Sequence, residues 1–470
     1  MTTAQTLNLL CRFESRNVTF LEADGSWPIV WERAQGCFVW DAEGRKYLDL
    51  TAAFGVAAAG HANPRVVRAG QRQMATLLHA MGDVHPHALK AQLAQRLSEL
   101  TFGRWAVRGG RREKALTQCG TGKVIFGNSG FEAVEAALKT ARLATGKPGI
   151  IAFEGGYHGL GYGALNATHR EHFREPFRNQ LLEFGHFLPF PEAPGPASGT
   201  GAPAGVPSDR RPRLSNTGRG CSLAQLETQL FAAFRRHAIG AILVEPVQAR
   251  GGIRIPPPDF LPLLRRVADE HGALLILDEI YTGFGRTGTW FACEHSGVVP
   301  DLICLGKALT GGFPLSACVG RADVMDAAWP PSSGEAIHTS TFLGHPVGCA
   351  MALAQIRELK AKRLVERTAK LGTWLAAELE RHGQLPNERG QMKSRCVGLM
   401  AGIEFSTPDG KPATDVCLTL MKRLLARSFI LLPEGEHGNI LSLTPPLTIT
   451  EAQLRRTLRA VAEELGRLAD

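Results

Sequence analysis

Two charged residues each follow a short apolar run, a position typical of a ligand site at the edge of a buried sheet. The run ALLIL at 273–277 ends at Asp278, and the run DLICLG precedes Lys307. Ligands of parallel sheets bind beyond the carboxyl ends of the strands. A buried carboxylate there needs a cationic partner. Burial also lowers the pKa of an amine, which then becomes a nucleophile suited to Schiff-base formation.

Each of the two residues also has a simpler explanation. Asp278 is compatible with a helix N-cap or a metal-binding aspartate, and Lys307 with a lysine whose long side chain reaches the surface. Neither residue alone therefore identifies a site.

A third feature is the turn of small residues at 127–132, between the strand-like run KVIFG and the helical pattern FEAVEAALKTA. Unpaired backbone N–H groups at a helix N-terminus attract anions, and the hydroxyl of Ser129 adds a donor. The turn is thus a candidate phosphate site. A capping box formed by Ser129 and Glu132 explains the same residues without a ligand.

Tyr157 and His158 follow the apolar run GIIAF, so an aromatic ring stands at another strand end. Such a ring stacks on a planar ligand, or it packs in the core or on the surface like any other aromatic. Two glycine patterns are weaker signals. GTGK at 120–123 lacks the leading glycine of a phosphate loop, and GLGYG at 159–163 lacks the dinucleotide spacing.

Short apolar strands alternate with helical patterns between about 123 and 320, which indicates an α/β fold with a mostly parallel sheet covered on both faces. We predict a large domain over 76–330. The N-terminal segment 1–75, with short alternating strands, is expected to contribute to a smaller α+β domain completed by 331–470. The stretch 188–220 is dense in Pro, Gly, Ser and Ala, and we expect it to be a mobile insertion.

Composition narrows the class of protein. Of 470 residues, 44% are hydrophobic and 21% charged, which is typical of a globular chain. No apolar run approaches a membrane span, and the N-terminus has no secretory pattern. The net charge of +9 is spread along the chain without a nucleic-acid-binding motif. The ten cysteines form no C-x-x-C pair, and free thiols fit a reducing cytoplasm. With the charge and hydropathy patterns above, we expect a cytoplasmic protein that binds neither nucleic acid nor membranes.

A metal site is not expected either. His79, His85 and His87 lie close together in the sequence, but no carboxylate or cysteine completes a set of ligands around them.

Together, the four features are the parts of a pyridoxal phosphate site: a lysine for the aldehyde, an anion for the ring nitrogen, a phosphate cradle and a stacking ring. The stretch ILDEIYTGFGRTG followed by DLICLGKALTGG resembles the signature of class III pyridoxal-phosphate-dependent aminotransferases of the ornithine, 4-aminobutyrate and ω-amino acid type. The resemblance spans roughly 30–460. The remaining matching segments are GHANPRV, GNSGFEAVEAALK, YHG, EPVQ, STFLGHPVGCA and TPPLTIT.

The resemblance implies a fold type I transferase that moves an amino group from an amine or ω-amino acid to a 2-oxo acid by a ping-pong route. Racemases, epimerases and aminomutases share the signature and remain the alternative. In the family, the lysine matching Lys307 forms the Schiff base and shuttles the proton, and the aspartate matching Asp278 pairs with the ring nitrogen. The aromatic matching Tyr157 stacks on the ring with His158 beside it. Tyr281 stands where the family often has Gln or a small side chain next to the cofactor's face.

The resemblance also implies how the phosphate is held. The turn matching Ser129, Gly130 and Phe131 binds it, with only the backbone N–H available from Phe131, where the family usually has Thr, Ser or Ala. Thr341 matches a threonine that reaches the phosphate of the neighbouring subunit. A homodimer with shared active sites is therefore expected.

Two departures from the family concern the substrate. Glu245 and Gln248 match family positions near the cofactor, but Ser442 stands where related enzymes carry an arginine that grips the substrate carboxylate. Arg250 stands where those enzymes carry the glutamate that pairs with it. The double change avoids a buried unpaired charge. Our hypothesis is that Arg250 supplies the guanidinium for carboxylate binding, and Arg286 is the alternative.

Overall fold

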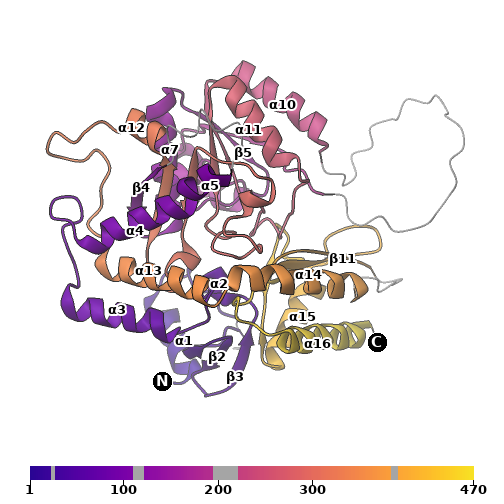
Figure 1. Cartoon of the computed structure of the whole chain (residues 1–470). Helices are drawn as coiled ribbons and strands as arrows, with labels where there is room; N and C mark the ends of the chain where they lie inside the picture. The colour runs from indigo at the N-terminus through magenta and orange to yellow at the C-terminus, as the bar shows by residue number, and fades with distance from the viewer. Residues whose placement is uncertain (23–26, 109–120, 194–220, 383–389, 470) are drawn as a thin grey trace, which may run out of the picture.

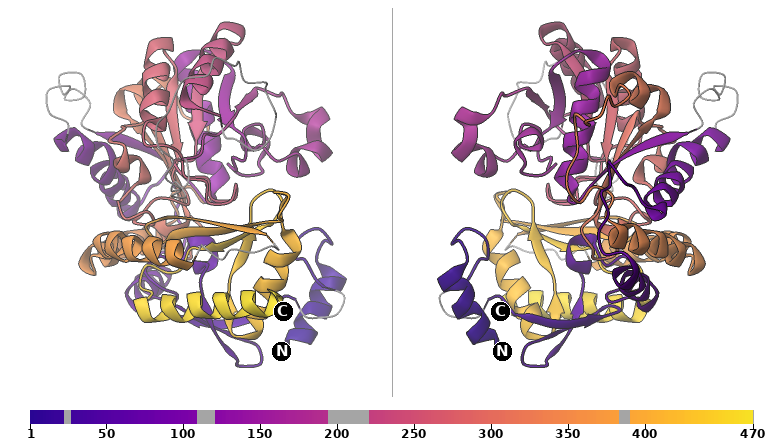
Figure 2. Two further views of the ribbon diagram at one scale, coloured as in Figure 1. Left: turned by 90° about the vertical axis from the view of Figure 1, so that its right-hand side faces the viewer. Right: turned by 90° about the vertical axis from the view of Figure 1, so that its left-hand side faces the viewer.

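The computed structural model describes residues 1–22, 27–108, 121–193, 221–382 and 390–469. Most of the predicted insertion at 188–220 lies outside the described residues, from 194 onward. Figure 2 shows an upper part that holds the largest sheet and its helices, and a lower part built from both ends of the chain. Both termini lie in this lower part.

The largest sheet has seven strands, and their order explains why several strand ends meet. Its order is β4 (Gly122–Gly127), β10 (Ser316–Arg321), β9 (Leu302–Leu305), β8 (Leu274–Asp278), β7 (Ile239–Val244), β5 (Gly149–Phe153) and β6 (Gly185–Leu188). From β9 to β6 every neighbouring pair is parallel, whereas β10 runs antiparallel to both of its neighbours. The predicted mostly parallel sheet is confirmed.

Helices cover both faces of the middle of this sheet, where β5, β7, β8 and β9 are apolar and buried. Ile276 of β8 belongs to a buried cluster with residues of α7 (Gly130–Thr145), while Leu275 and Leu277 belong to another with residues of α11 (Phe260–His271). Alternate side chains of a strand point to opposite faces. Therefore α7 and α11 lie on opposite sides of the sheet.

The lower part contains two four-stranded sheets. One has the order β1 (Trp31–Gln35), β2 (Phe38–Asp41), β3 (Lys46–Asp49) and β13 (Phe429–Ile430); the other is β11 (Gln391–Val397), β12 (Met400–Ser406), β15 (Ile440–Leu443) and β14 (Leu432–Glu434). Because β13 pairs with β3, the predicted N-terminal strands share a sheet with the C-terminal part of the chain. The domain limits at 75 and 330 stay a prediction.

The other helices complete the layers seen in Figure 1. They are α1 (Thr3–Phe13), α2 (Ala52–Gly55), α3 (Pro64–Thr76), α4 (Ala88–Ser98), α5 (Arg104–Arg108), α8 (Tyr162–Leu165), α9 (Glu171–Arg174), α10 (Leu223–Arg236), α12 (Ala322–Ala328), α13 (Pro346–Ala361), α14 (Leu364–His382), α15 (Thr414–Ala426) and α16 (Glu451–Ala469). Across the described ranges, none combines the length and apolar character that a membrane crossing requires. The nine cysteines in those ranges are free thiols.

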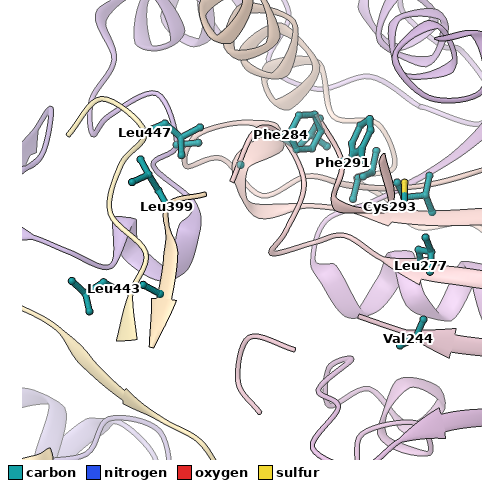
Figure 3. Packing of buried hydrophobic residues seen from close by; sticks show 14 of the residues in the cluster. Val244, Leu277, Phe284, Phe291, Cys293, Leu399, Leu443 and Leu447 are labelled. Carbon is teal, nitrogen blue, oxygen red and sulfur yellow. The ribbon is translucent and has the colours of Figure 1, made fainter. Parts of the chain in front are cut away.

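One hydrophobic core joins the two parts. In Figure 3, Leu399, Leu443 and Leu447 from the C-terminal segments lie on the left of the view, and Phe284, which follows β8, lies to their right. All four side chains are buried members of the cluster that also contains the α11 side of the large sheet. The lower part is thus packed against the strand ends rather than tethered by a linker.

Two helical glycines should respond in opposite ways to replacement by alanine. A Cβ on Gly372 of α14 would lie 2.5 Å from the carbonyl oxygen of Gly398 and still closer to its Cα, whereas a Cβ on Gly466 of α16 would meet nothing. We expect Gly372→Ala to lower the free energy of unfolding by about 1–3 kcal/mol. Gly466→Ala should raise it by about 0.5–1 kcal/mol. Urea unfolding of both variants checks this, and two changes of equal sign would contradict the packing described.

Candidate active site

The predicted site residues gather where the strands of the large sheet end. Asp278 closes β8 and Lys307 follows β9 after one glycine. Two glycines show how closely these ends approach α7. A Cβ on Gly130 would lie 3.1 Å from Ile280, and one on Gly306 would lie 3.3 Å from Ile280 and 3.9 Å from the Cα of Gly130. The structure thus brings the lysine, the aspartate loop and the start of α7 together.

Asp278 is a buried carboxylate held by a histidine. Its side chain is 5% exposed, and its Oδ2 lies 2.8 Å from Nδ1 of His158, while Oδ1 accepts the backbone N–H of Ile280 at 3.1 Å. His158 is fixed in turn, because its N–H donates to Thr168 Oγ1 at 2.9 Å. A buried aspartate whose orientation is set in this way suits a cationic ring nitrogen as a further partner.

Lys307 is partly buried and sits in an unusual backbone conformation. Its φ of 42° lies in the left-handed region, which costs energy for a residue with a side chain and is often found at functional sites. Nζ lies 4.4 Å from the centre of the Tyr281 ring. Burial lowers the pKa of this amine, although Asp278 and other nearby carboxylates oppose the shift. The neutral, nucleophilic amine is therefore more accessible than for an ordinary lysine.

The turn before α7 contains the capping box of Ser129 and Glu132, which was the alternative to a phosphate site in the sequence. The carboxylate of Glu132 accepts the backbone N–H groups of Asn128 at 2.6 Å and Ser129 at 2.7 Å, and the Ser129 hydroxyl at 3.1 Å. Gly130 and Phe131 are the first residues of α7, so helix geometry gives their N–H groups no acceptor within the helix. These two N–H groups are the strongest anion donors of the turn.

The GLGYG stretch has a structural role beside this turn. A Cβ on Gly161 would lie 2.6 Å from the ring of Phe131, and Gly159 also leaves no room between its backbone and that side chain. Ala164 N–H donates to Glu135 of α7 at 3.0 Å. The glycines therefore let the loop after β5 pack directly on α7, and the ring of Phe131, 39% exposed, fills this contact.

Glu245 and Gln248 lie behind the site, after β7. Glu245 is buried, and its carboxylate accepts the N–H of Tyr157 at 3.0 Å and that of Ala249 at 3.1 Å. Burial raises the pKa of Glu245 to about 7, although the nearby His158 opposes the shift. Gln248 donates to the carbonyl of Glu154 at 2.9 Å. Both residues thus fix the loop that carries Tyr157.

Tyr281 is buried between the site and the N-terminal segment. Its hydroxyl lies 3.0 Å from Thr444 Oγ1, which donates to the carbonyl of Thr51 at 3.2 Å. A Cβ on Gly55 would lie 3.0 Å from the Tyr281 ring. Burial raises the pKa of Tyr281 to about 12, so the hydroxyl keeps its proton at neutral pH.

Arg250 reaches the outer side of the site and faces a second carboxylate. Its guanidinium carbon lies 5.1 Å from the centre of the Tyr157 ring, and its Nε lies 4.0 Å from Oε2 of Glu434. Glu434 ends β14, opposite Ile440, and Ser442 stands opposite Leu432. Directly opposed residues share a sheet face, so Glu434 and Ser442 point to the same side. The Glu434 carboxylate therefore lies on the same face of this sheet as the Ser442 side chain, and it faces Arg250.

Arg286 lies close enough to Tyr281 for each to affect the pKa of the other, but its described hydrogen bonds point elsewhere, and Thr341 has no described contact with this cluster. Arg286 is 2% exposed, and its Nη1 donates to the carbonyls of Leu399 at 2.9 Å and Pro445 at 2.5 Å. This arginine joins the two parts of the chain instead of lining the pocket beside Arg250. Thr341 is exposed in the loop before α13, and no contact within the described ranges links it to Lys307.

Sequence reasoning missed Glu434 and Arg170. Glu434 directly follows the apolar run FILLP, just as Asp278 follows ALLIL. A charged residue after an apolar run was therefore a signal that could have identified it. Arg170 carries no comparable signal. Its Nη2 donates to the carbonyl of Arg250 at 3.0 Å and also to that of Gly435. It thereby fixes the backbone next to both charged partners.

Comparisons with known proteins agree with this geometry. The family described as aminotransferase class-III matches residues 21–465. The chain is 34% identical over 448 residues to the 5-aminovalerate aminotransferase DavT of Pseudomonas aeruginosa, covering 94% of each protein. It is 35% identical over 474 residues to the putrescine aminotransferase of Pectobacterium atrosepticum, covering 98% of this chain and 88% of the relative.

A solved structure shares the whole fold. The (S)-enantioselective omega-transaminase of Thermomicrobium roseum superposes with a TM-score of 0.82 at 28% identity and full coverage of both chains. The predicted fold type I architecture and the predicted family are confirmed. The chain therefore belongs to the class-III aminotransferases and is a pyridoxal-phosphate-dependent transaminase.

Proposed function

We propose that this transaminase moves an amino group from an amine or ω-amino acid to a 2-oxo acid, with Lys307 as its catalytic amine. The observation that carries the proposal is the partly buried Lys307, in a left-handed backbone conformation, beside Tyr281 and the Asp278 loop. The relatives named for 5-aminovalerate and putrescine support a donor with a terminal amine.

The residues at the strand ends fit pyridoxal phosphate. Asp278 offers a buried carboxylate that His158 orients, and such a group matches a protonated pyridine nitrogen. The N–H groups of Gly130 and Phe131 match the phosphate, and the half-buried ring of Tyr157 provides a flat apolar surface. The Ser129 hydroxyl turns to the phosphate only if it leaves Glu132.

Pyridoxal phosphate supplies an aldehyde that accepts the amino group and a ring that withdraws electrons from the substrate carbon. Lys307 would hold the aldehyde through Nζ, and its free amine would move the proton at the substrate carbon. Asp278 holds the proton on the ring nitrogen, and His158 keeps the Asp278 carboxylate in place. The ring of Tyr281, whose centre lies 4.4 Å from Nζ, limits the access of water to the amine.

The proposal includes a homodimer in a reducing cytoplasm. Thr341 lies exposed in a loop away from Lys307 of its own chain, which agrees with a role at the phosphate of a neighbouring subunit. The free thiols among the described cysteines agree with a reducing compartment. Sedimentation of the purified protein at several concentrations tests the dimer.

Lys307 is expected to carry the cofactor covalently. Borohydride reduction of the holoenzyme followed by peptide mass spectrometry should find the pyridoxyl group on the peptide that contains Lys307. Lys307→Ala should abolish that label and lower the rate of amino transfer by about 10³-fold. A label on a different lysine would overturn the assignment.

Arg250 is expected to bind the carboxylate of the 2-oxo acid. Arg250→Ala should raise the KM for the oxo acid at least about tenfold, because a charge-assisted hydrogen bond is lost. Arg266→Ala removes an exposed arginine of α11 that pairs with Glu227, so it serves as the control and should leave this KM unchanged. An unchanged KM in Arg250→Ala would contradict the hypothesis.

Glu245 should make the stability of the protein depend on pH. Its pKa rises from 4.5 to about 7 on folding, so its stabilising contribution is complete below pH 4.5 and is lost as the pH rises to 7. Glu245→Gln removes this loss. Relative to the native protein, the variant should gain up to about 3 kcal/mol between pH 5 and pH 8. Urea unfolding at both pH values measures it, and a pH-independent difference would refute the argument.

A further inference from the structure

Arg250 and Glu434 are charged neighbours in the candidate site, and neither has its hydrogen bonds satisfied. The Nε atom of Arg250 is buried and has no acceptor within the described part of the chain. Glu434 receives no hydrogen bond from any described residue, and its closest cation is that same Nε at 4.0 Å. The Glu434 side chain is 7% exposed, so the carboxylate is nearly removed from water but can still be reached by a ligand.

The Arg250 side chain as a whole is 37% exposed, but a buried polar atom such as its Nε is nearly always hydrogen-bonded. The separation of 4.0 Å is too long for a hydrogen bond between the two side chains. The backbone around them is held firmly, since Arg170 donates to the carbonyls of both Arg250 and Gly435. Gly435 N–H in turn donates to the carbonyl of Arg250 at 3.2 Å. The two unsatisfied groups are therefore presented by a fixed loop contact.

The charges describe the ligand that would satisfy both groups. A carboxylate of the ligand would pair with the Arg250 guanidinium, and an ammonium group would pair with the Glu434 carboxylate. These two groups of the ligand must be close to each other. The head of an α-amino acid carries both on one carbon atom. A ligand with a carboxylate alone would place a negative charge beside Glu434, and a ligand with an ammonium alone would place a positive charge beside Arg250.

The position of the pair relative to the amine gives the ligand a direction. Glu434 raises the pKa of the Lys307 amine and Arg250 lowers it, so both charges lie within electrostatic reach of that amine. The guanidinium of Arg250 also lies over the ring of Tyr157. A substrate held at its head by this pair therefore extends its other end toward Lys307. The reacting amine is then the terminal one and not the α-amine.

We propose that Arg250 and Glu434 together bind the ammonium–carboxylate head of an amino acid whose side chain ends in the amine that reacts at Lys307. The inference rests on the proposed amino transfer and narrows its donor to diamino acids. Glu434 is the residue that reads the α-ammonium, and Arg250 reads the α-carboxylate. In the second half of the reaction the oxo acid brings a carboxylate without an ammonium, so Arg250 holds it without a contact to Glu434 and more weakly than the head of the donor.

Four matched donors separate the two contributions. Lysine carries both head charges, 6-aminohexanoate lacks the α-ammonium, 1,5-diaminopentane lacks the carboxylate, and pentylamine lacks both. The holoenzyme is mixed with each donor without oxo acid, and the rate at which the cofactor's visible absorbance disappears is compared at limiting donor. Lysine should react at least about tenfold faster than each of the others. The same four-donor comparison is repeated one carbon shorter, with ornithine and its three corresponding analogues, to allow for chain length.

Variants then assign each charge to its residue. Glu434→Gln should remove the preference for lysine over 6-aminohexanoate and keep the preference over 1,5-diaminopentane. Arg250→Ala should have the opposite effect. Glu436→Gln makes the same charge change at an exposed position two residues away and should behave as the native enzyme. Nuclear magnetic resonance of the lysine product should show oxidation of the terminal carbon.

The outcomes that overturn the inference differ from those that overturn the proposed function. Equal rates for lysine and its analogues in both chain-length series, an unchanged preference in Glu434→Gln, or reaction at the α-amine would each refute the head-group assignment. Conversion of pentylamine under those results would leave amino transfer intact. If none of the eight donors reacted, and no oxo acid accepted an amino group, the proposed function would fail as well.

Discussion

The buried contact between Asp278 and His158 is the interaction on which the rest of the site depends. A carboxylate at 5% exposure needs hydrogen-bond partners, and the fold provides Nδ1 of His158 at 2.8 Å and the backbone N–H of Ile280 at 3.1 Å. His158 is held through Thr168 in the loop after β5, while Asp278 closes β8. Two loops of the large sheet are thereby locked in one arrangement, and Tyr157 is carried with them.

Opposite charges are also paired on the outer side of the site, around Glu434. Lys307, Arg250 and Arg170 lie around Glu434, and each of the three lowers the pKa that burial raises for this carboxyl. Arg250 in the loop after β7 and Glu434 of the short strand β14 place opposite charges face to face. The Glu434 side chain is only 7% exposed and depends on these cations, whereas the Arg250 side chain is 37% exposed and lies partly in water.

Strand ends were the most informative part of the sequence. Asp278 and Lys307 were predicted from apolar runs that stop at a charged residue, and the parallel order of β7, β8 and β9 brings such ends together. The packing of GLGYG on Phe131 was not predictable, because it depends on how closely α7 approaches a loop from another part of the chain. The burial of Arg286 against two carbonyls depends likewise on contacts between distant segments.

The central claim is that the enzyme takes an amino group from a donor and passes it to a 2-oxo acid, which returns the cofactor to its starting form. A spectral titration tests this claim most directly. The holoenzyme is titrated with a simple amine in the absence of oxo acid while its visible absorbance is recorded, and a 2-oxo acid is then added. The account predicts that the visible band disappears with the amine and returns with the oxo acid. A band that shifts without disappearing would contradict amino transfer and favour an epimerase or aminomutase, and no band even with added cofactor would contradict the use of pyridoxal phosphate.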